Sequence, residues 1–486
     1  MLTFDHRTSK VGRRSFLRAG SLGIGSLTLG GALGGLSLAD LFQAQAQAAT
    51  LGTGSSGKKP KFGGLDGIVK DKAIVFLHMQ GGPSQFETFD PKMNAPSEIR
   101  SATGEIATRV SGLTFGSTFT RLAGMADKLT IVRNFVPGNA NHDVKPIVSA
   151  ATRDASVGAL YARVAGTTRP ETGLPTSAWI NPQAIDTAER KPTLSFGKFN
   201  DPGRLGAGYA PFVPGSGGPL QQAMRLSMTP DRLHDRRELL GRLDSIKRRI
   251  DADGGLAGMD RFQEQAFEVI LKGAGDAFDL KNEDPRVIER YDTAPLVTPA
   301  QISKKWNNYK EYVTHGKSLG KLMLMARRLV ENGVGFVTVS TDFVWDNHAD
   351  SNNAGVAEGM TYCGLPFDHA VGTFLDDLAA RGLSDKVLLI CCGEIGRSPR
   401  INKNGGRDHW GTLGPLMMAG GGMPRGKVIG QSARDGGTPH GDPVTQENLI
   451  GTIFNTVFDV GRLRLLPGMS TDLLRIAESQ PIAGLT

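Results

Sequence analysis

The sequence has few cysteines, and it lacks a basic run interleaved with aromatic residues. Its three cysteines, Cys363, Cys391 and Cys392, cannot build a disulfide framework, and we expect buried free thiols. The net charge of +8 falls to +5 when the five basic and two acidic side chains of residues 1–48 are set aside. So weak and diffuse a charge predicts no nucleic-acid partner.

Long apolar runs are also missing after the N-terminal segment, so we expect no stable membrane span in the mature chain. Residues 12–18, GRRSFLR, carry paired arginines followed by two apolar residues, and they resemble a twin-arginine signal. A mildly apolar, glycine-rich segment follows, and small residues before Ala48 offer a cleavage site. The alternative is an N-terminal membrane anchor, which the glycines disfavour.

These features predict a signal peptide over residues 1–48, a flexible linker over 49–72, and one domain over 73–480. The protein would use the twin-arginine export machinery and be periplasmic or extracellular. Residues 230–332 have helical periodicity and are predicted to form a helical layer or insertion.

Strand-like runs alternate with helical patterns along the chain. The apolar runs with strand character are Ala73–Leu77, 128–135, 334–340, 387–392 and Pro415–Ala419. Helical patterns lie at 144–161, 298–332, 368–382 and 445–460. This alternation is typical of an α/β fold with a central, mainly parallel sheet sandwiched by helices.

Polar side chains gather where four of the predicted strands end. These four groups are Ser84 to Asp90, Asn139 to Asp143, Asp346 to Asp350 and Glu394 to His409. Because the carboxyl ends of parallel strands share one edge of a sheet, ligands of α/β proteins bind there. The alternative is a glycine-rich loop with solvated charges.

Five of these side chains combine two imidazoles with three carboxylates. They are the predicted metal ligands Asp346, His348, Glu394, Asp408 and His409. Such a set suits one or two divalent metals, with Zn, Mn or Fe preferred to Ca.

Other residues at the same strand ends are predicted to handle an anion. Arg397 or Arg407 would pair with a phosphate or sulfate oxygen, and the Gly81 and Gly82 amides would orient it together with Ser84. A histidine at a helix start is often only a cap or packing residue, but His142 is also a candidate acid or base.

The motifs at these strand ends are similar to those of an exported family of unknown function, DUF1501. The likeness covers most of the chain after about residue 72, and its most specific segments are GEIGRSP (393–399) and GRDHW (406–410). That family is placed by similarity in the alkaline phosphatase and sulfatase superfamily. The resemblance implies a sheet between helices with a metal site at the strand ends.

Within that resemblance, Asp346 and His348 correspond to an Asp and a His ligand after a central strand. Glu394 falls where an Asp-His pair is expected, and His409, with Asp408 beside it, resembles the last histidine ligand.

The sequence departs from the superfamily at two places. Residues 78–80, His-Met-Gln, replace a metal-binding aspartate after the first strand, and residues 139–142 fill the region where a Ser, Thr or modified Cys nucleophile is expected. Because of the first departure, Glu87 or Asp90 would have to reach back to the metal site in place of the missing aspartate. The second departure argues against covalent catalysis.

The predicted function is an exported, metal-dependent phosphate- or sulfate-ester hydrolase that uses a metal-activated water. Its ligand would be a small-molecule or polymeric anionic ester. The alternative is a non-catalytic exported binding or surface-assembly protein that keeps the fold without turnover.

Overall fold

The computed structural model describes residues 62–63, 67–143, 147–189, 198–215 and 274–485. The chain divides into two compact units, Met1–Lys58 and Lys59–Thr486, and all of the described residues belong to the second unit. The predicted signal peptide, most of the linker and residues 230–273 of the predicted insertion lie outside the described residues.

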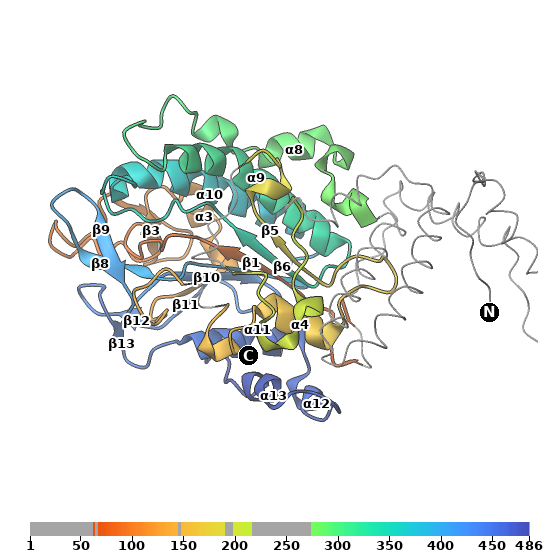
Figure 1. The fold of residues 1–486 in the computed structure, drawn as a ribbon. Helices are drawn as coiled ribbons and strands as arrows, with labels where there is room; N and C mark the ends of the chain where they lie inside the picture. The colour runs from red at the N-terminus through yellow and green to blue at the C-terminus, as the bar shows by residue number, and fades with distance from the viewer. Residues whose placement is uncertain (1–61, 64–66, 144–146, 190–197, 216–273, 486) are drawn as a thin grey trace, which may run out of the picture. The chain divides into compact units, whose positions relative to one another are not determined.

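A seven-stranded sheet forms the centre of the fold, in the order β11-β4-β10-β7-β1-β6-β5 (Figure 1). Its strands are β1 Ala73–His78, β4 Leu129–Val132, β5 Ser177–Ile180, β6 Phe336–Ser340, β7 Val387–Cys392, β10 Leu416–Gly420 and β11 Lys427–Ile429. Only β10 runs antiparallel to its neighbours, and all other pairs are parallel. The predicted mainly parallel sheet is therefore confirmed.

Three two-stranded ribbons lie outside this sheet. They are β2 Glu105–Ala107 with β3 Thr114–Gly116, β8 Gly396–Ile401 with β9 Arg407–Trp410, and β12 Gln431–Ser432 with β13 Pro439–His440.

Helices cover both faces of the sheet. The α-helices among the described residues are α3 Thr120–Ala123, α4 Val157–Ala165, α8 Pro285–Tyr291, α9 Tyr309–Glu331, α10 Val356–Ala380, α11 Gln446–Val457, α12 Val460–Leu463 and α13 Thr471–Ala477. Helices α9 and α10 lie on one face, whereas α4, α11 and α13 lie on the other (Figure 1).

The central strands are apolar throughout because both of their faces are covered. All six residues of β1 are buried, and so are all six of β7. Side chains alternate between the layers: Val75 and Leu77 join the core with α9 and α10, whereas Ile74 and Phe76 join the core with α4 and α11. Packing in the two cores therefore fixes the position of each strand within the sheet and the point at which it ends.

Some helix boundaries differ from those predicted. Helix α10 begins at Val356 rather than at Asp368, and its extra turns include Gly359, Gly364 and Pro366. These residues disfavour helices in isolation, so packing against α9 overrides their propensity. Helix α4 begins only at Val157, where the Ser156 side chain caps it by accepting a hydrogen bond from the Ala159 amide.

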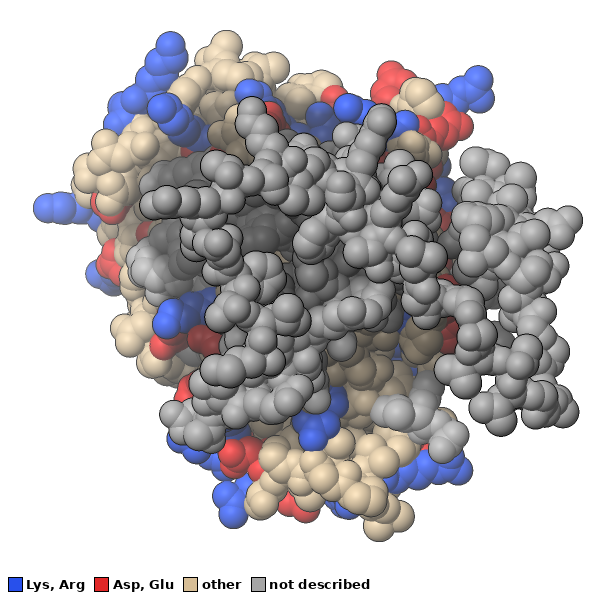
Figure 2. Space-filling model, turned by 45° about the vertical axis from the view of Figure 1, so that its right-hand side comes forward, with Lys and Arg blue, Asp and Glu red and all other residues tan. Residues whose placement is uncertain are grey.

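Three further features of the fold are the state of the cysteines, the length of the helices and the distribution of surface charge. The three cysteines are free and buried, as predicted. Among the described helices, none is both long and apolar enough to cross a bilayer. On the face shown in Figure 2, the visible basic and acidic side chains are interspersed around the rim of the described surface.

Candidate metal centre

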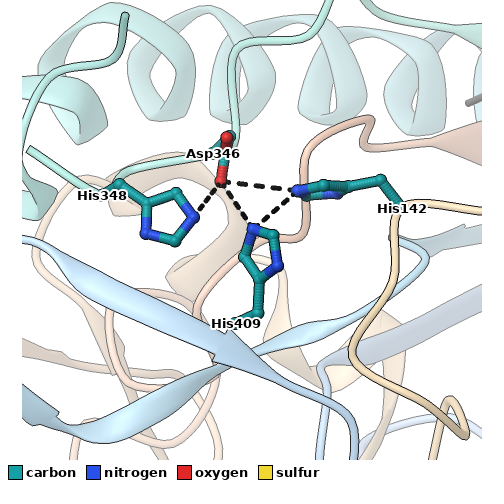
Figure 3. A group of neighbouring side chains, drawn as sticks. All are labelled: His142, Asp346, His348 and His409. Atoms are coloured by element: carbon teal, nitrogen blue, oxygen red, sulfur yellow. Dashed lines mark hydrogen bonds and ion pairs between the residues drawn. The ribbon is translucent and has the colours of Figure 1, made fainter. Parts of the chain in front are cut away.

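Four side chains from three strand exits converge at the carboxyl edge of the sheet (Figure 3). His142 follows β4, Asp346 and His348 follow β6, and His409 lies in β9. Each offers one ligand atom, and these atoms all lie within 4.8 Å of one another. We call these four residues the edge cluster.

Three imidazoles of the edge cluster face one carboxylate oxygen. The Oδ1 atom of Asp346 lies 3.1 Å from His348 Nε2, 3.5 Å from His409 Nε2 and 3.7 Å from His142 Nε2. The Nε2 atoms of His142 and His409 are themselves only 2.8 Å apart. Three ring nitrogens and a carboxylate aimed at one point form a donor set that fits Zn, Mn or Fe.

Two further carboxylates stand behind the imidazoles. Glu394 Oε1 lies 2.7 Å from His142 Nδ1, and Asp408 Oδ1 lies 3.5 Å from His348 Nδ1. Metal-binding histidines commonly donate their second ring N–H to a carboxylate, which fixes the tautomer and the ring orientation. Both residues were predicted as ligands, and the structure places them one shell further out, outside the group of four.

Glu394 is fully buried and connects two strand exits. Its Oε1 also accepts a hydrogen bond of 2.9 Å from the Gly81 amide. Its Oε2 lies 3.2 Å from His78 Nε2, close enough for an ion pair but misaligned for a hydrogen bond. Burial alone would raise the pKa of Glu394, but the interactions with His142 and His78 lower it to about 2.

His78 has no assigned role in the sequence prediction. The sequence contains one signal for such a role. His78 is the last residue of an otherwise apolar strand, and it occupies the position where the family resemblance expects a metal-binding aspartate. The ring is fully buried and packs edge-on against Phe199.

The edge cluster is electrostatically coupled. Burial alone would raise the pKa of Asp346, but the charge of Arg397 and hydrogen bonds from three histidines hold it far below its usual value. Burial alone would lower the pKa of His142, yet hydrogen bonds to Asp346 and Glu394 raise it. A hydrogen bond to Asp346 favours the protonated form of His409, but burial and the charge of Arg397 lower its pKa.

The structure gives Arg397 internal partners. Its side chain is fully buried, its Nη2 lies 2.5 Å from Asp346 Oδ1, and its Nε donates to the Gly82 carbonyl at 2.8 Å. Its Nη2 also donates to the Gly81 carbonyl, and its Nη1 donates to the carbonyl of Arg407. Arg397 therefore ties the β1, β6 and β9 segments together and orients the carboxylate of the edge cluster.

Arg407 is equally buried. It pairs with Glu87 at 3.0 Å, stacks 4.2 Å from the Phe86 ring, and donates to the carbonyls of Ile99 and Arg100. Neither arginine faces solvent, because a β-ribbon carries both toward the inside of the fold. The sequence could not separate a ligand-facing arginine from one that holds loops together.

Gly81, Gly82 and Ser84 shape the first loop. Gly81 has φ +112°, and a Cβ atom there would lie 2.6 Å from the backbone nitrogen of Asp346. The Ser84 hydroxyl donates to Glu87, and the Gly81 amide donates to Glu394. The Gly82 amide donates to the Met79 carbonyl, so all three predicted anion donors have protein partners in this structure.

The buried carboxylates near the edge cluster outnumber the arginines. Asp346, Glu394 and Glu87 are opposed by Arg397 and Arg407, and the raised pKa of His142 favours an imidazolium between Asp346 and Glu394. A metal cation bound by the imidazoles would replace that proton and compensate the same carboxylates. The fold and site together define an α/β protein with a candidate metal centre at the carboxyl edge of a mainly parallel sheet.

The chain belongs to the DUF1501 family, described as a protein of unknown function, whose model matches residues 71–464. No curated protein matches the sequence.

Several solved structures show a distant likeness. One is the C-terminal periplasmic domain of EcEptC from Escherichia coli in complex with Zn, at 8% identity and TM-score 0.30, covering 75% of this chain and 74% of that one. Another is a phosphonate monoester hydrolase from Silicibacter pomeroyi, at 10% identity and TM-score 0.31, covering 79% and 73%. A third is the PsFucS1 sulfatase from Pseudoalteromonas sp., at 11% identity and TM-score 0.30, covering 92% and 77%.

Proposed function

We propose that this protein is an exported, metal-dependent hydrolase of phosphate or sulfate esters. The observation that carries the proposal is the edge cluster, in which three imidazoles and one carboxylate share a focus and two of the imidazoles have a carboxylate behind them. Balanced structural ion pairs do not need this arrangement, whereas a transition-metal site does.

The cluster is accessible from solvent on one side. The side chains of His348 and His409 are 21% and 33% exposed, whereas those of His142 and Asp346 are nearly buried. A divalent metal bound there would polarise an ester oxygen and lower the pKa of a bound water. The protein's own contribution is to hold His142 through Glu394 and Asp346 through Arg397, so that little reorganisation is needed.

Water is the proposed nucleophile because no hydroxyl or thiol belongs to the edge cluster. Ser84 is buried and bonded to Glu87, and the three cysteines are buried. The same observation favours the second candidate function, a non-catalytic exported binding or surface-assembly protein that retains a metal. Both candidate functions require a bound metal, and only the hydrolase would also turn over an ester.

Metal analysis of the purified mature protein is the primary test. We expect about one or two equivalents of Zn, Mn or Fe, as the donor set prefers these metals. A protein that stays metal-free after incubation with Zn and Mn would refute the proposal. With metal bound, aryl phosphate monoesters, phosphate diesters and aryl sulfates then test for hydrolysis, and absence of turnover on all three favours the binding protein.

Export is proposed on the sequence of residues 12–18 alone. Replacing both Arg13 and Arg14 by lysine tests it, because the paired arginines are the feature that the export machinery reads. The wild-type chain should be recovered from the periplasm or medium and the double variant from the cytoplasm. Equal distribution of the two would rule out twin-arginine export.

A further inference from the structure

A pair of neighbouring cavities lies apart from the edge cluster. The larger, of about 750 Å³, is bounded by the loop that follows β1, by β2 and β3, and by Arg434 and Asp435 after β12. The smaller, of about 350 Å³, lies beside residues 110–113 and β11. Lys92 and Arg133 line both cavities, so these two side chains form a shared wall.

The position of the cavities in the fold relates them to the edge cluster. Strand β1 is parallel to β6 and β7, and β4 and β11 run in the same sense because β10 is antiparallel to both β7 and β4. Arg133 and Gly430 directly follow β4 and β11, so the cavities open at the carboxyl edge where the edge cluster lies. None of the four cluster residues lines either cavity.

The shared wall carries a net positive charge. Asp90 is buried and accepts a hydrogen bond from the Ser432 hydroxyl. Its carboxylate lies 3.3 Å from Lys92 Nζ and 3.6 Å from Arg133 Nη1. Two partly exposed cations thus share one carboxylate, which leaves the shared wall with one positive charge in excess.

Both cations are held in place. The Arg133 guanidinium donates to the Phe89 carbonyl through Nε at 3.0 Å and through Nη2 at 2.6 Å. Lys92 has φ +52°, a left-handed conformation that is uncommon for a residue with a side chain. Its ammonium group makes only long contacts, 3.3 Å to Asp90 and 3.4 Å to the Ser432 carbonyl, so its donors can turn toward an anion.

The rim and the remaining lining indicate what kind of anion fits. At the rim, exposed Arg434 is opposed by the exposed acids Glu105 and Asp435, so positive charge is confined to the wall. The rest of the lining mixes polar groups such as Asn94 and Gln431 with apolar ones such as Ile99, and neither lining includes an aromatic side chain on which a nucleic-acid base could stack. Two cavities joined at one wall suit a ligand longer than a single sugar unit.

We propose that the two cavities form a binding groove for an acidic oligosaccharide, whose sulfate, phosphate or carboxylate group lies against Lys92 and Arg133. The groove would hold one unit of the chain while an ester-bearing unit reaches the edge cluster. The presentation of an ester to the edge cluster rests on the proposed function, whereas binding of the oligosaccharide in the groove does not.

Binding of dextran sulfate to the full mature chain, with neutral dextran of the same length as comparison, tests the groove by titration calorimetry. Lys92→Met should weaken binding of dextran sulfate roughly tenfold, the loss expected for one charge-assisted hydrogen bond. Arg434→Met, at the exposed rim, should weaken it by about threefold. The matched control is Lys281→Met, an exposed lysine on another part of the surface, which should bind as the wild type does.

Several results would overturn the groove. They are unchanged affinity in both Lys92→Met and Arg434→Met, equally tight binding of neutral dextran, or tighter binding of a single-stranded oligonucleotide of equal charge. If Lys92→Met unfolds at lower urea concentration than the wild type, Arg434→Met decides alone.

The variant His409→Ala separates this proposal from the proposed function. Dextran sulfate should bind His409→Ala as it binds the wild type, because His409 lines neither cavity. Binding of dextran sulfate by a wild-type chain that holds no metal and shows no turnover would refute the hydrolase and leave the groove standing. Lost binding in this variant would place the polymer at the edge cluster and refute the groove.

Discussion

Two groups of buried ionisable side chains in this fold have opposite designs. The first is the edge cluster. The second, here called the ion-pair network, joins α9 and α10 to the segment before α8 and consists of Glu283, Arg327, Glu331, Asp377 and Arg381. Both contain a buried arginine beside an aspartate.

In the ion-pair network each carboxylate pairs with at least two arginines, when the bordering Arg328 and Arg290 are included. Arg327 lies 2.5 Å from Glu283 and 2.7 Å from Glu331, and Arg381 lies 2.6 Å from Glu331. Each charge faces an opposite charge, so an added ion has no role. In the edge cluster three imidazoles face one aspartate that Arg397 already engages. A candidate metal site is therefore marked by several ring nitrogens that converge on one carboxylate, rather than by a high density of charged side chains.

The largest expected effect is on stability, in the ion-pair network. Arg327→Met should lower the free energy of unfolding by about 3 kcal/mol, because it removes a buried guanidinium that pairs with Glu283, Glu331 and the buried Asp377. Urea unfolding followed by circular dichroism measures the loss, and metal content per folded protein should not change. A variant with wild-type stability would show that the network does not stabilise the fold.

The next effect is on metal binding, in the edge cluster. His409→Ala should weaken metal binding by at least about 100-fold, since it removes one of four donors rather than a supporting group. Metal content after dialysis measures it, and His440→Ala, an exposed histidine on β13, is the control. If His409→Ala retains as much metal as His440→Ala does, His409 is not a ligand.

A third comparison uses a histidine of the helical layer. His315 on α9 is almost fully buried, its Nε2 lies 3.3 Å from the Cys363 carbonyl, and burial lowers its pKa to about 4. The unfolded chain, with a histidine pKa of about 6.5, binds the proton more tightly. Stability that is complete above pH 6.5 should therefore fall by about 3 kcal/mol as the pH drops to 4.

His315→Gln isolates this contribution, because glutamine keeps a donor but does not titrate in this range. We expect the stability of the variant to fall by about 3 kcal/mol less than that of the wild type between pH 7 and pH 4. Urea midpoints at several pH values measure the difference. Parallel pH profiles would contradict the depressed pKa of this histidine.

The smallest effects concern the carboxylates behind the imidazoles. Glu394→Gln should weaken metal binding by about 10- to 100-fold, because a buried carboxylate orients His142. Asp408→Asn should weaken it by about threefold or less, since its side chain is 65% exposed and lies 3.5 Å from His348. Competition with a chelator measures both, and an equal loss in the two variants would show that burial does not decide their roles.

Much of the fold follows from local patterns. Val387–Cys392 was predicted as a strand buried on both faces, and β7 has these bounds. The early start of α10 was missed, because helix-breaking residues there are overruled by contacts with α9 that no local window contains. The antiparallel direction of β10 was missed for a similar reason, since strand direction depends on how the chain returns to the sheet.

The sequence by itself determined which edge of the sheet gathers the polar side chains, because polar residues follow apolar strands at four places and parallel strands share an edge. It also supplied the residues that meet there, among them Asp346, His348 and His409.

Only the tertiary structure decided how these residues lie relative to one another. It brings His142 into the same group, sets Glu394 and Asp408 behind the imidazoles, and turns Arg397 and Arg407 inward. The physical reason is that a side chain which could bind a metal and the side chain that supports it are only one hydrogen bond apart. They differ in the direction in which each side chain points. That direction is fixed by packing between loops that are far apart in the sequence.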